Sequence, residues 1–228
     1  MEELSPQDLN WCVRRLPSRV REIIKKEEIV VSGGYIRACI TGETVSDIDL
    51  FTYSKMYAED LALQIVDNHK EKLHISDNAI TIRNFQYIVQ FITRWTFDTP
   101  TQIIDSFDFT ICKAAFWWEH YCQKWCSIVS PSFYSDLAAK RLVYTSPVRD
   151  EEIGGSMLRV LKYYQRGYKI PLDSLAKVIA RTVGKIYIRD EEATLTLDNR
   201  LNEEKLFPII RGLLYEVDPL IDPDHLLH

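Results

Sequence analysis

Two aspartates stand one residue apart in an apolar stretch of this chain, as Asp47-Ile48-Asp49-Leu50. Successive side chains of a β-strand point to opposite faces, so Asp47 and Asp49 share one face. Ile48 and Leu50 then point into the core. Two carboxylates this close repel each other unless a cation lies between them, and Mg²⁺ commonly binds one or two carboxylates together with substrate phosphates. The pair therefore predicts a metal site that works on a phosphorylated substrate.

A glycine pair precedes the aspartates. The apolar run Val30-Val31 leads through Ser32 into Gly33 and Gly34, and a short helix-like segment follows. Backbone N–H groups at the N-terminus of a helix attract phosphate groups. We therefore predict that Ser32, Gly33 and Gly34 contact phosphate. A phosphate-binding turn beside metal-binding carboxylates indicates chemistry on a nucleoside triphosphate.

Strands and helices must position these residues. The patterns predict a strand over 28–32, a helix over 34–41 that ends near Gly42, and a strand over 46–52. Further predicted helices start at Ser5-Pro6 and cover 19–26, 57–68, 131–141 and a short segment after Thr99; further strands cover 78–82, 87–93, 107–116 and 122–129. Beyond Pro147 only helices are predicted, over 153–168, 172–182 and 201–215. The expected fold is α/β (α+β): a small mixed sheet with flanking helices over 1–145, and a mostly helical part over 146–228.

Composition narrows the class of protein. The chain of 228 residues carries a net charge of −5, which argues against a protein built mainly for non-specific nucleic-acid binding. Its five cysteines, an odd number with irregular spacing, favour reduced thiols. No apolar stretch reaches the roughly 20 residues that span a bilayer, and the N-terminus lacks the pattern of a signal peptide. We expect a cytoplasmic protein without a membrane segment.

Three blocks of the sequence resemble the DNA polymerase beta-like nucleotidyltransferases, most of all the head and neck of CCA-adding enzymes and bacterial poly(A) polymerases. The first is Gly33-Gly34-Tyr35-Ile36-Arg37 with Gly42 and Asp47-Ile48-Asp49, in the spacing of that family. The second, Asp108-Phe109-Thr110-Ile111-Cys112, is similar to a segment that helps to hold the ribose. The third, 158–168, is similar to a neck helix with regularly spaced basic residues. The blocks come in family order.

The resemblance implies a nucleotidyltransferase of the EC 2.7.7 type, which moves a nucleoside monophosphate from a triphosphate such as ATP to an acceptor hydroxyl and releases pyrophosphate. It implies two Mg²⁺ ions, one activating the hydroxyl and one steadying the triphosphate. The acceptor is left open between an RNA 3′ end, such as that of a tRNA, a small molecule and a protein. The implied catalytic and metal-binding residues are Asp47, Asp49 and Asp108, and the implied nucleotide-binding residues are Ser32, Gly33, Gly34, Arg37, Arg159, Lys162 and Arg166.

Each remaining candidate has a structural alternative. Arg37, one turn into the helix, either contacts substrate, forms an ion pair at the site or is a surface charge. Asp108 lies between aromatic residues, so a hydrogen-bonding role competes with a metal or ribose role. The basic residues Arg159, Lys162 and Arg166 share one face of a helix and contact either the nucleotide or only solvent and nearby acids.

The chain also departs from the family pattern. Ala38 stands where an Asp is usual, Phe107 replaces an Arg, and Gln90 holds the place of a third acidic residue. Asp108 becomes the third carboxylate if its strand lies next to the strand of Asp47 and Asp49. Ala38 and Gln90 favour an alternative function, a nucleotide-binding or regulatory domain of the same fold with weak or no turnover, whereas the intact Asp47-Ile48-Asp49 argues against it.

Overall fold

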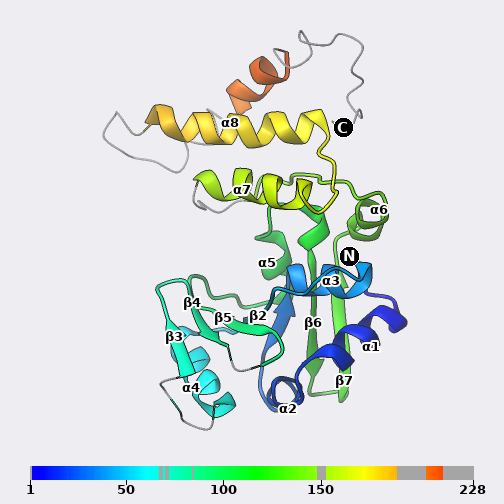
Figure 1. The fold of residues 1–228 in the computed structure, drawn as a ribbon, viewed down its shortest axis with the longest axis vertical. Coiled ribbons are helices and arrows are strands. Elements are labelled where there is room, and N and C mark those ends of the chain that lie inside the picture. The colour runs from blue at the N-terminus through cyan, green and yellow to red at the C-terminus, as the bar shows by residue number, and fades with distance from the viewer. Residues whose placement is uncertain are drawn as a thin grey trace. The chain divides into compact units, whose positions relative to one another are not determined.

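A computed structural model describes residues 2–66, 69, 72–83, 85–147, 153–188 and 204–212 of the chain. It divides into two compact units (Figure 1). The first comprises Met1–Phe107 and Ile111–Phe133, and the second comprises Asp108–Thr110 and Tyr134–His228. The division by contacts therefore falls at Phe133 and Tyr134 instead of at residue 145. The assignment of 1–145 and 146–228 as domains stays a prediction.

The first unit is built around a mixed sheet of seven strands in the order β3-β4-β5-β2-β1-β6-β7. The central pair β2 and β5 is parallel, and the other neighbours are antiparallel. The strands are β1 (Val30–Ser32), β2 (Asp47–Phe51), β3 (Leu73–Ile75), β4 (Ala79–Ile82), β5 (Ile88–Ile92), β6 (Ala114–Glu119) and β7 (Lys124–Val129). The structure confirms the predicted α/β class and adds β3, which the sequence analysis missed.

Helices α1 to α5 belong to this unit. They are α1 (Pro6–Arg15), α2 (Ser18–Lys26), α3 (Gly34–Thr41), α4 (Lys55–Ile65) and α5 (Pro100–Asp105). Figure 1 shows α1, α2 and α3 running across one face of the sheet. The helix starts predicted at Ser5-Pro6 and after Thr99 are confirmed: the Ser5 hydroxyl accepts a hydrogen bond from the backbone N–H of Asp8, and the Thr99 hydroxyl accepts one from the backbone N–H of Gln102.

The two faces of the sheet follow from the strand register. Asp49 lies between Ser32 on β1 and Gln90 on β5, and Phe51 pairs with Val30. Since paired residues point to the same side, these five side chains share one face with Asp47, which we call the carboxylate face. Ile103 of α5 packs against Phe51 and Val30, so α5 covers part of the carboxylate face.

Helices dominate the second unit. Within the described residues it contains α7 (Ile153–Tyr164), α8 (Leu172–Ile188) and a helical segment at 204–212, while α6 (Phe133–Ala138) begins at the boundary. Phe109 forms a bridge to Tyr144 and stacks edge-on with Tyr144 and Tyr163. Among the described residues, no helix is both long and apolar enough to cross a membrane.

Two element predictions that concern candidate site residues are wrong. Residues 107–116 do not form one strand, because the backbone of Asp108 and Thr110 bonds to Thr145 and Val143. A short 3-10 helix follows, η2 (Thr110–Cys112), and the strand begins only at Ala114. The helix predicted over 153–168 ends at Tyr164, since Gly167 takes a positive φ of 83° that closes a C-terminal turn. The turn predicted at Arg83-Asn84 and part of the helix predicted over 201–215 lie outside the described residues.

Candidate active site

The aspartate pair lies on β2, in the centre of the sheet. Asp47 and Asp49 are half-buried, whereas Ile48 and Leu50 between and after them are completely buried. This alternation is the one that the sequence predicts. The Ser46 hydroxyl donates a 2.6 Å hydrogen bond to Oδ1 of Asp47. Both carboxylates therefore remain on one face of the sheet at a depth that a substrate can reach.

The turn between β1 and α3 comes close to Asp49. Gly33 has φ 85° and ψ −143°, a conformation that essentially only glycine adopts. A Cβ atom added at Gly33 would lie 3.5 Å from Oδ2 of Asp49 and 3.2 Å from the ring of Phe107. The absence of a side chain at Gly33 thus lets the backbone at the start of α3 approach the carboxylate. Phosphate-binding turns need this close backbone approach.

The Ser32 hydroxyl is directed into the sheet. Ser32 is fully buried, and its Oγ donates a 2.6 Å hydrogen bond to the carbonyl of Ala114 on β6. The backbone N–H of Gly33 donates to the same carbonyl at 3.3 Å. These two bonds fix the end of β1. A phosphate contact by Ser32 stays a prediction, and its structural role is the one that the contacts show.

Arg37 is a buried residue of α3. Its side chain is 3% exposed, its Nε lies 3.2 Å from a carboxylate oxygen of Glu43, and its Nη1 lies 3.7 Å from Sγ of Cys112. The guanidinium also lies against Gly34, where an added Cβ would be 3.6 Å from Nη2. Of the alternatives open from the sequence, Arg37 therefore forms the ion pair, which ties the start of α3 to the chain around Glu43 and Cys112.

Gln90 occupies the sheet position beside Asp49. The parallel register of β2 and β5 pairs these two residues directly. The Gln90 amide nitrogen donates a 3.0 Å hydrogen bond to the Thr81 hydroxyl, which turns the amide oxygen away from Thr81. An amide oxygen is a neutral ligand for Mg²⁺ and a poor base. The carboxylate face thus carries one amide group next to its two carboxylates.

This donor set fits a hard cation that binds together with phosphate. The described residues contain no group of three or more His, Cys, Asp or Glu side chains that could hold a metal ion without help. Mg²⁺ usually keeps several waters and takes one or two carboxylates plus the substrate phosphates. Asp47 and Asp49 are suited to hold Mg²⁺ in this shared way.

Asp108 lies in the second unit, and its partners come from α7. The carboxylate is 3% exposed, and its Oδ2 accepts hydrogen bonds from Ser156 Oγ at 2.9 Å and from Arg159 Nη1 at 2.5 Å. Gly155 leaves room for the guanidinium, since a Cβ there would lie 3.6 Å from it. Asp108 is not on a strand beside β2, whose neighbours are β1 and β5. The condition under which Asp108 becomes the third carboxylate, a strand next to β2, is therefore not met, and its metal role stays a prediction.

The basic residues of the third block do not form one helix face. Arg159 and Lys162 lie on α7, but Arg166 follows the end of the helix in the turn that leads to Gly167. Arg159 is paired with Asp108, and Lys162 is exposed. Sequence reasoning placed Asp108 and Arg159 separately in the site, and the structure joins them as an ion pair.

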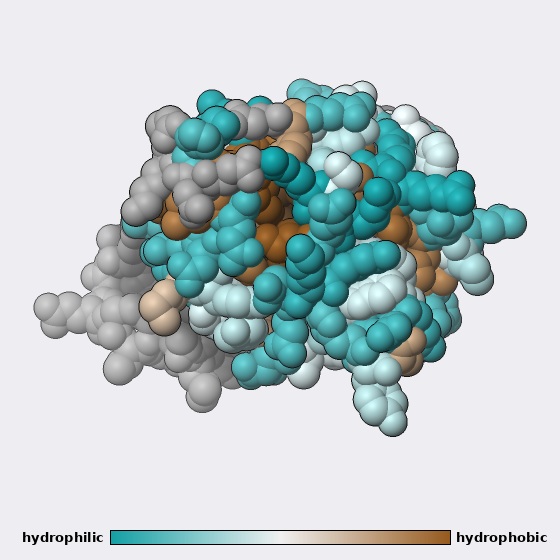
Figure 2. Space-filling view, turned by 90° about the horizontal axis from the view of Figure 1, so that it is seen from below, coloured by the Kyte–Doolittle hydropathy of each residue, from teal (hydrophilic) through white to brown (hydrophobic). Residues whose placement is uncertain are grey.

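An aromatic cluster continues along the carboxylate face below Asp49. Phe51 packs edge-on against Phe97 and Phe107, with ring centroids 5.7 and 6.2 Å apart. A cavity of about 310 Å³ lies beyond it, lined by residues that include Phe51, Tyr53, Phe97, Trp117 and Trp118. Figure 2 views the molecule from below and shows apolar surface between hydrophilic side chains. The sequence analysis missed the contact of Phe107 with Gly33, although Phe107 directly precedes the second block.

The chain is similar to one protein family and to several solved structures. Residues 4–140 match the family described as Gabija anti-defense 2 family protein. The fold matches the CCA-adding enzyme of Thermotoga maritima complexed with tRNA, at 18% identity and a TM-score of 0.54, over 95% of this chain and 55% of that one. It also matches a CCA-adding enzyme with ATP, at 18% identity and a TM-score of 0.55, over 94% and 55% of the two chains. A tRNA-processing enzyme without ligand matches at 21% identity and a TM-score of 0.54, over 92% and 59%.

Identities this low show the fold alone. They confirm the predicted resemblance to nucleotidyltransferases of the CCA-adding type. This chain spans little more than half of the length of the structures that it matches. No curated protein matches it in sequence.

Proposed function

This chain belongs to the Gabija anti-defense 2 family, and we propose that it is a Mg²⁺-dependent nucleotidyltransferase. It transfers a nucleoside monophosphate from a triphosphate to an acceptor hydroxyl and releases pyrophosphate. The observation that carries this proposal is the approach of the Gly33 turn to Asp49, because it combines a phosphate-binding backbone with metal-binding carboxylates at one point of the sheet.

The residues of the first unit divide the work. The first backbone N–H groups of α3, which follow Gly33, bind the triphosphate through the positive end of the helix dipole. Asp47 and Asp49 bind Mg²⁺ together with the phosphate oxygens. The Mg²⁺ that they would hold would supply positive charge to the phosphates and would lower the pKa of the attacking hydroxyl. Ser32 and Arg37 hold the turn in place, since both are buried and bonded within the unit.

The protein contributes mainly position and charge. Phosphoryl and nucleotidyl transfers need reactants held in line and negative charge neutralised, and they require little covalent participation by side chains. The half-buried carboxylates on a central strand, fixed on both sides by β1 and β5, satisfy that need. Lys162 and Arg166 of the second unit are proposed to contact the triphosphate or the base.

The family description suggests the setting of this activity. We propose that the transfer acts against the Gabija defense, with an RNA 3′ end, a protein or a small molecule as acceptor. The structures of CCA-adding enzymes with ATP and with tRNA support a nucleoside triphosphate as donor and an RNA as one candidate acceptor.

A second function is a nucleotide-binding module with weak or no turnover. The amide of Gln90 beside Asp49 favours it, because an amide cannot act as the base that removes a proton from the acceptor hydroxyl. The two functions share triphosphate binding and differ in transfer.

One experiment tests both functions. The protein is incubated with each α-³²P-labelled triphosphate, Mg²⁺ and either total RNA or a cell lysate, beside Asp47→Asn and Asp49→Asn. Label on an acceptor that disappears in both variants supports the transferase. Mg²⁺-dependent triphosphate binding without label on any fraction supports the binding module. Absence of Mg²⁺-dependent triphosphate binding contradicts both. Asp60→Asn, an acid on the distant helix α4, is the matched control and is expected to behave as the wild type.

A further inference from the structure

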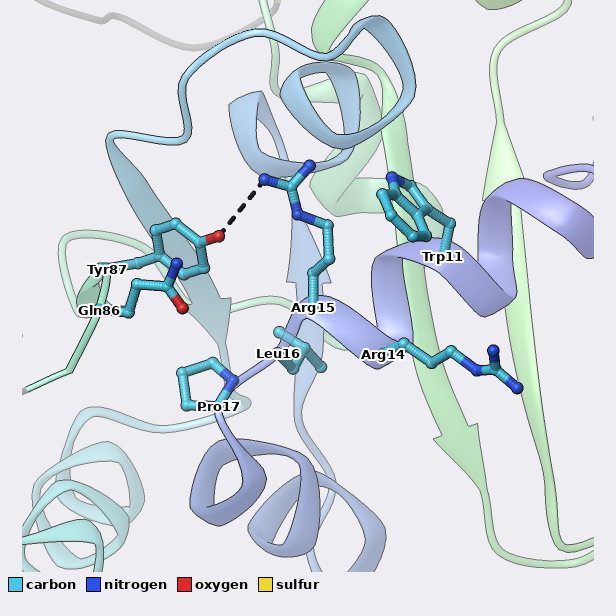
Figure 3. Close-up of a pocket in the computed structure, with 7 residues that line it drawn as sticks. All are labelled: Trp11, Arg14, Arg15, Leu16, Pro17, Gln86 and Tyr87. Atoms are coloured by element: carbon cyan, nitrogen blue, oxygen red, sulfur yellow. Dashed lines mark hydrogen bonds between the residues drawn. The ribbon is translucent and has the colours of Figure 1, made fainter.

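A pocket at the end of α1 combines two arginines with two aromatic rings. It has a volume of about 570 Å³, within the range of roughly 300–1,000 Å³ that is usual for ligand pockets. Its lining consists of Trp11, Arg14, Arg15, Leu16, Pro17, Gln86 and Tyr87, and Figure 3 shows these side chains. We call it the α1 pocket. The lining residues come from two segments some 70 residues apart in the sequence, so no local sequence motif predicts the pocket.

Arg15 is held in position by both aromatic residues. Its Nη2 donates a 3.3 Å hydrogen bond to the Tyr87 hydroxyl, and its guanidinium carbon lies 5.6 Å from the centre of the Trp11 ring. Figure 3 shows the guanidinium between the two rings. The hydrogen bond that Arg15 donates to Tyr87 raises the pKa of Arg15, so the group keeps its positive charge. A cation that is already oriented loses little freedom when it binds an anion.

Trp11 is fixed but accessible. Its indole nitrogen donates a 3.0 Å hydrogen bond to the carbonyl of Cys39, while 52% of the residue remains exposed. Large aromatic side chains usually bury most of their area, so an anchored ring with an open surface is available for stacking. Gln86 and Arg14 are also exposed at the rim.

The charge of the pocket differs from that of the chain. No carboxylate is among the residues that line it, although the whole chain has a net charge of −5. Arginines in the last turn of a helix also stabilise the helix dipole, which is sufficient to explain Arg14 and Arg15 alone. The helix dipole does not explain an exposed Trp11, nor Tyr87 placed across the pocket from it.

We propose that the α1 pocket binds single-stranded nucleic acid. Arg15, between the two rings, binds one phosphate of the strand, Arg14 at the exposed rim binds another, and an unpaired base stacks on the open side of Trp11. Basic grooves with aromatic rings are the common solution for single strands, because every base offers a flat face and every nucleotide carries a phosphate. Guanidinium groups match phosphate oxygens in geometry as well as in charge. An acidic peptide would use the arginines but would make no use of the exposed part of the indole ring.

The position of the pocket connects it with the candidate active site. Tyr87 directly precedes β5, and the next residue, Ile88, pairs with Asp47. The pocket thus lies near the start of β2, and alternation along the chain directs Tyr87, one residue before Ile88, to the face opposite the carboxylates. If the proposed transferase activity holds, the bound strand is its acceptor; this assignment rests on the proposed function, whereas binding itself does not.

Binding is measured apart from transfer. Fluorescence anisotropy follows fluorescein-labelled RNA and DNA of the same sequence, about 10 nucleotides long, in EDTA and without triphosphate. Arg14→Glu is expected to weaken binding roughly ten-fold and to reduce the salt dependence of binding. Trp11→Ala is expected to weaken binding by a similar factor, whereas Trp11→Phe, which keeps a flat ring, retains most of it. The RNA and DNA arms show which strand is preferred.

The controls separate this site from general attraction. Lys26→Glu makes the same charge change at an exposed position of α2 and is expected to leave binding unchanged. Equal loss in Lys26→Glu and Arg14→Glu, or no loss in Arg14→Glu, would overturn the proposal. Competition would also overturn the proposal if polyglutamate displaced the labelled RNA as well as unlabelled RNA does at the same concentration of negative charge. Asp49→Asn is expected to bind the strand as the wild type does. If this variant loses transfer but keeps binding, the loss lies in the active site alone. If the protein shows no transfer at all, the binding result for the α1 pocket is still valid.

Discussion

Asp49 on β2 lies directly opposite Gln90 on β5, so the carboxylate face presents an amide beside its two acids. This pairing suggests a substitution that changes one charge and almost no volume. Gln90→Glu places a third carboxylate next to Asp49. Since like charges repel, we expect a lower melting temperature in EDTA and a larger gain in melting temperature on addition of Mg²⁺ than in the wild type. Thermal unfolding with and without Mg²⁺ measures both.

Gln64→Glu on α4 is the matched control, because it makes the same change at an exposed position. The variant is expected to unfold as the wild type does, with or without Mg²⁺. If Gln90→Glu also shows no dependence on Mg²⁺, the site does not hold a metal.

Mg²⁺ is expected to bind weakly alone and tightly with a triphosphate. The described residues supply the carboxylates of Asp47 and Asp49 but no third acidic group beside them. Phosphate oxygens must then complete the shell of the ion. Calorimetric titration of Mg²⁺ into the protein, with and without a non-hydrolysable triphosphate, measures the difference. Equal affinity in both titrations would contradict a site that the substrate completes.

Gly33→Ala is expected to destabilise the fold and to abolish triphosphate binding. Its φ of 85° with ψ of −143° is unfavourable for alanine by roughly 1–3 kcal/mol, and the new methyl group would lie 3.2 Å from the Phe107 ring. Gly42→Ala is the control: Gly42 also has a positive φ, of 72°, but nothing lies within 4 Å of its added Cβ. It is expected to lose only about 1 kcal/mol and to keep triphosphate binding. Urea unfolding and a binding assay compare the two; equal loss of binding in both variants would remove Gly33 from the site.

The Asp108–Arg159 pair is expected to respond unequally to loss of either partner. Arg159→Met leaves the Asp108 carboxylate, which is 3% exposed, with the Ser156 hydroxyl but without its cation. Asp108→Asn instead leaves a guanidinium that is 38% exposed and can be hydrated. We expect a loss of roughly 2–4 kcal/mol in the first variant and about 1–2 kcal/mol in the second. Urea unfolding measures both, with Lys162→Met as a control on the exposed side of α7. The reverse order would show that Asp108 is not the group that depends on the pair.

The sequence by itself determined the local features of the candidate site. The period of two in Asp47-Ile48-Asp49-Leu50 is enough to place both carboxylates on one face, because side-chain alternation is a property of a single strand. The cap at Ser5 and the positive φ at Gly42 are likewise set within a few residues of each site. The spacing of the glycine pair and the aspartates also sufficed to indicate the nucleotidyltransferase fold.

Only the tertiary structure decided which distant residues meet. Asp108 looked like part of a strand, but its backbone bonds to Thr145 and its carboxylate bonds to α7, so it does not share a strand face with Asp49. Gln90 lies beside Asp49 because of a register that depends on long-range pairing of β2 with β5. The α1 pocket likewise brings together Trp11 and Tyr87, which lie far apart in the sequence. Local patterns fix which way a side chain points, whereas contacts between distant segments depend on the packing of the whole core, and that packing assigns each polar group its partner.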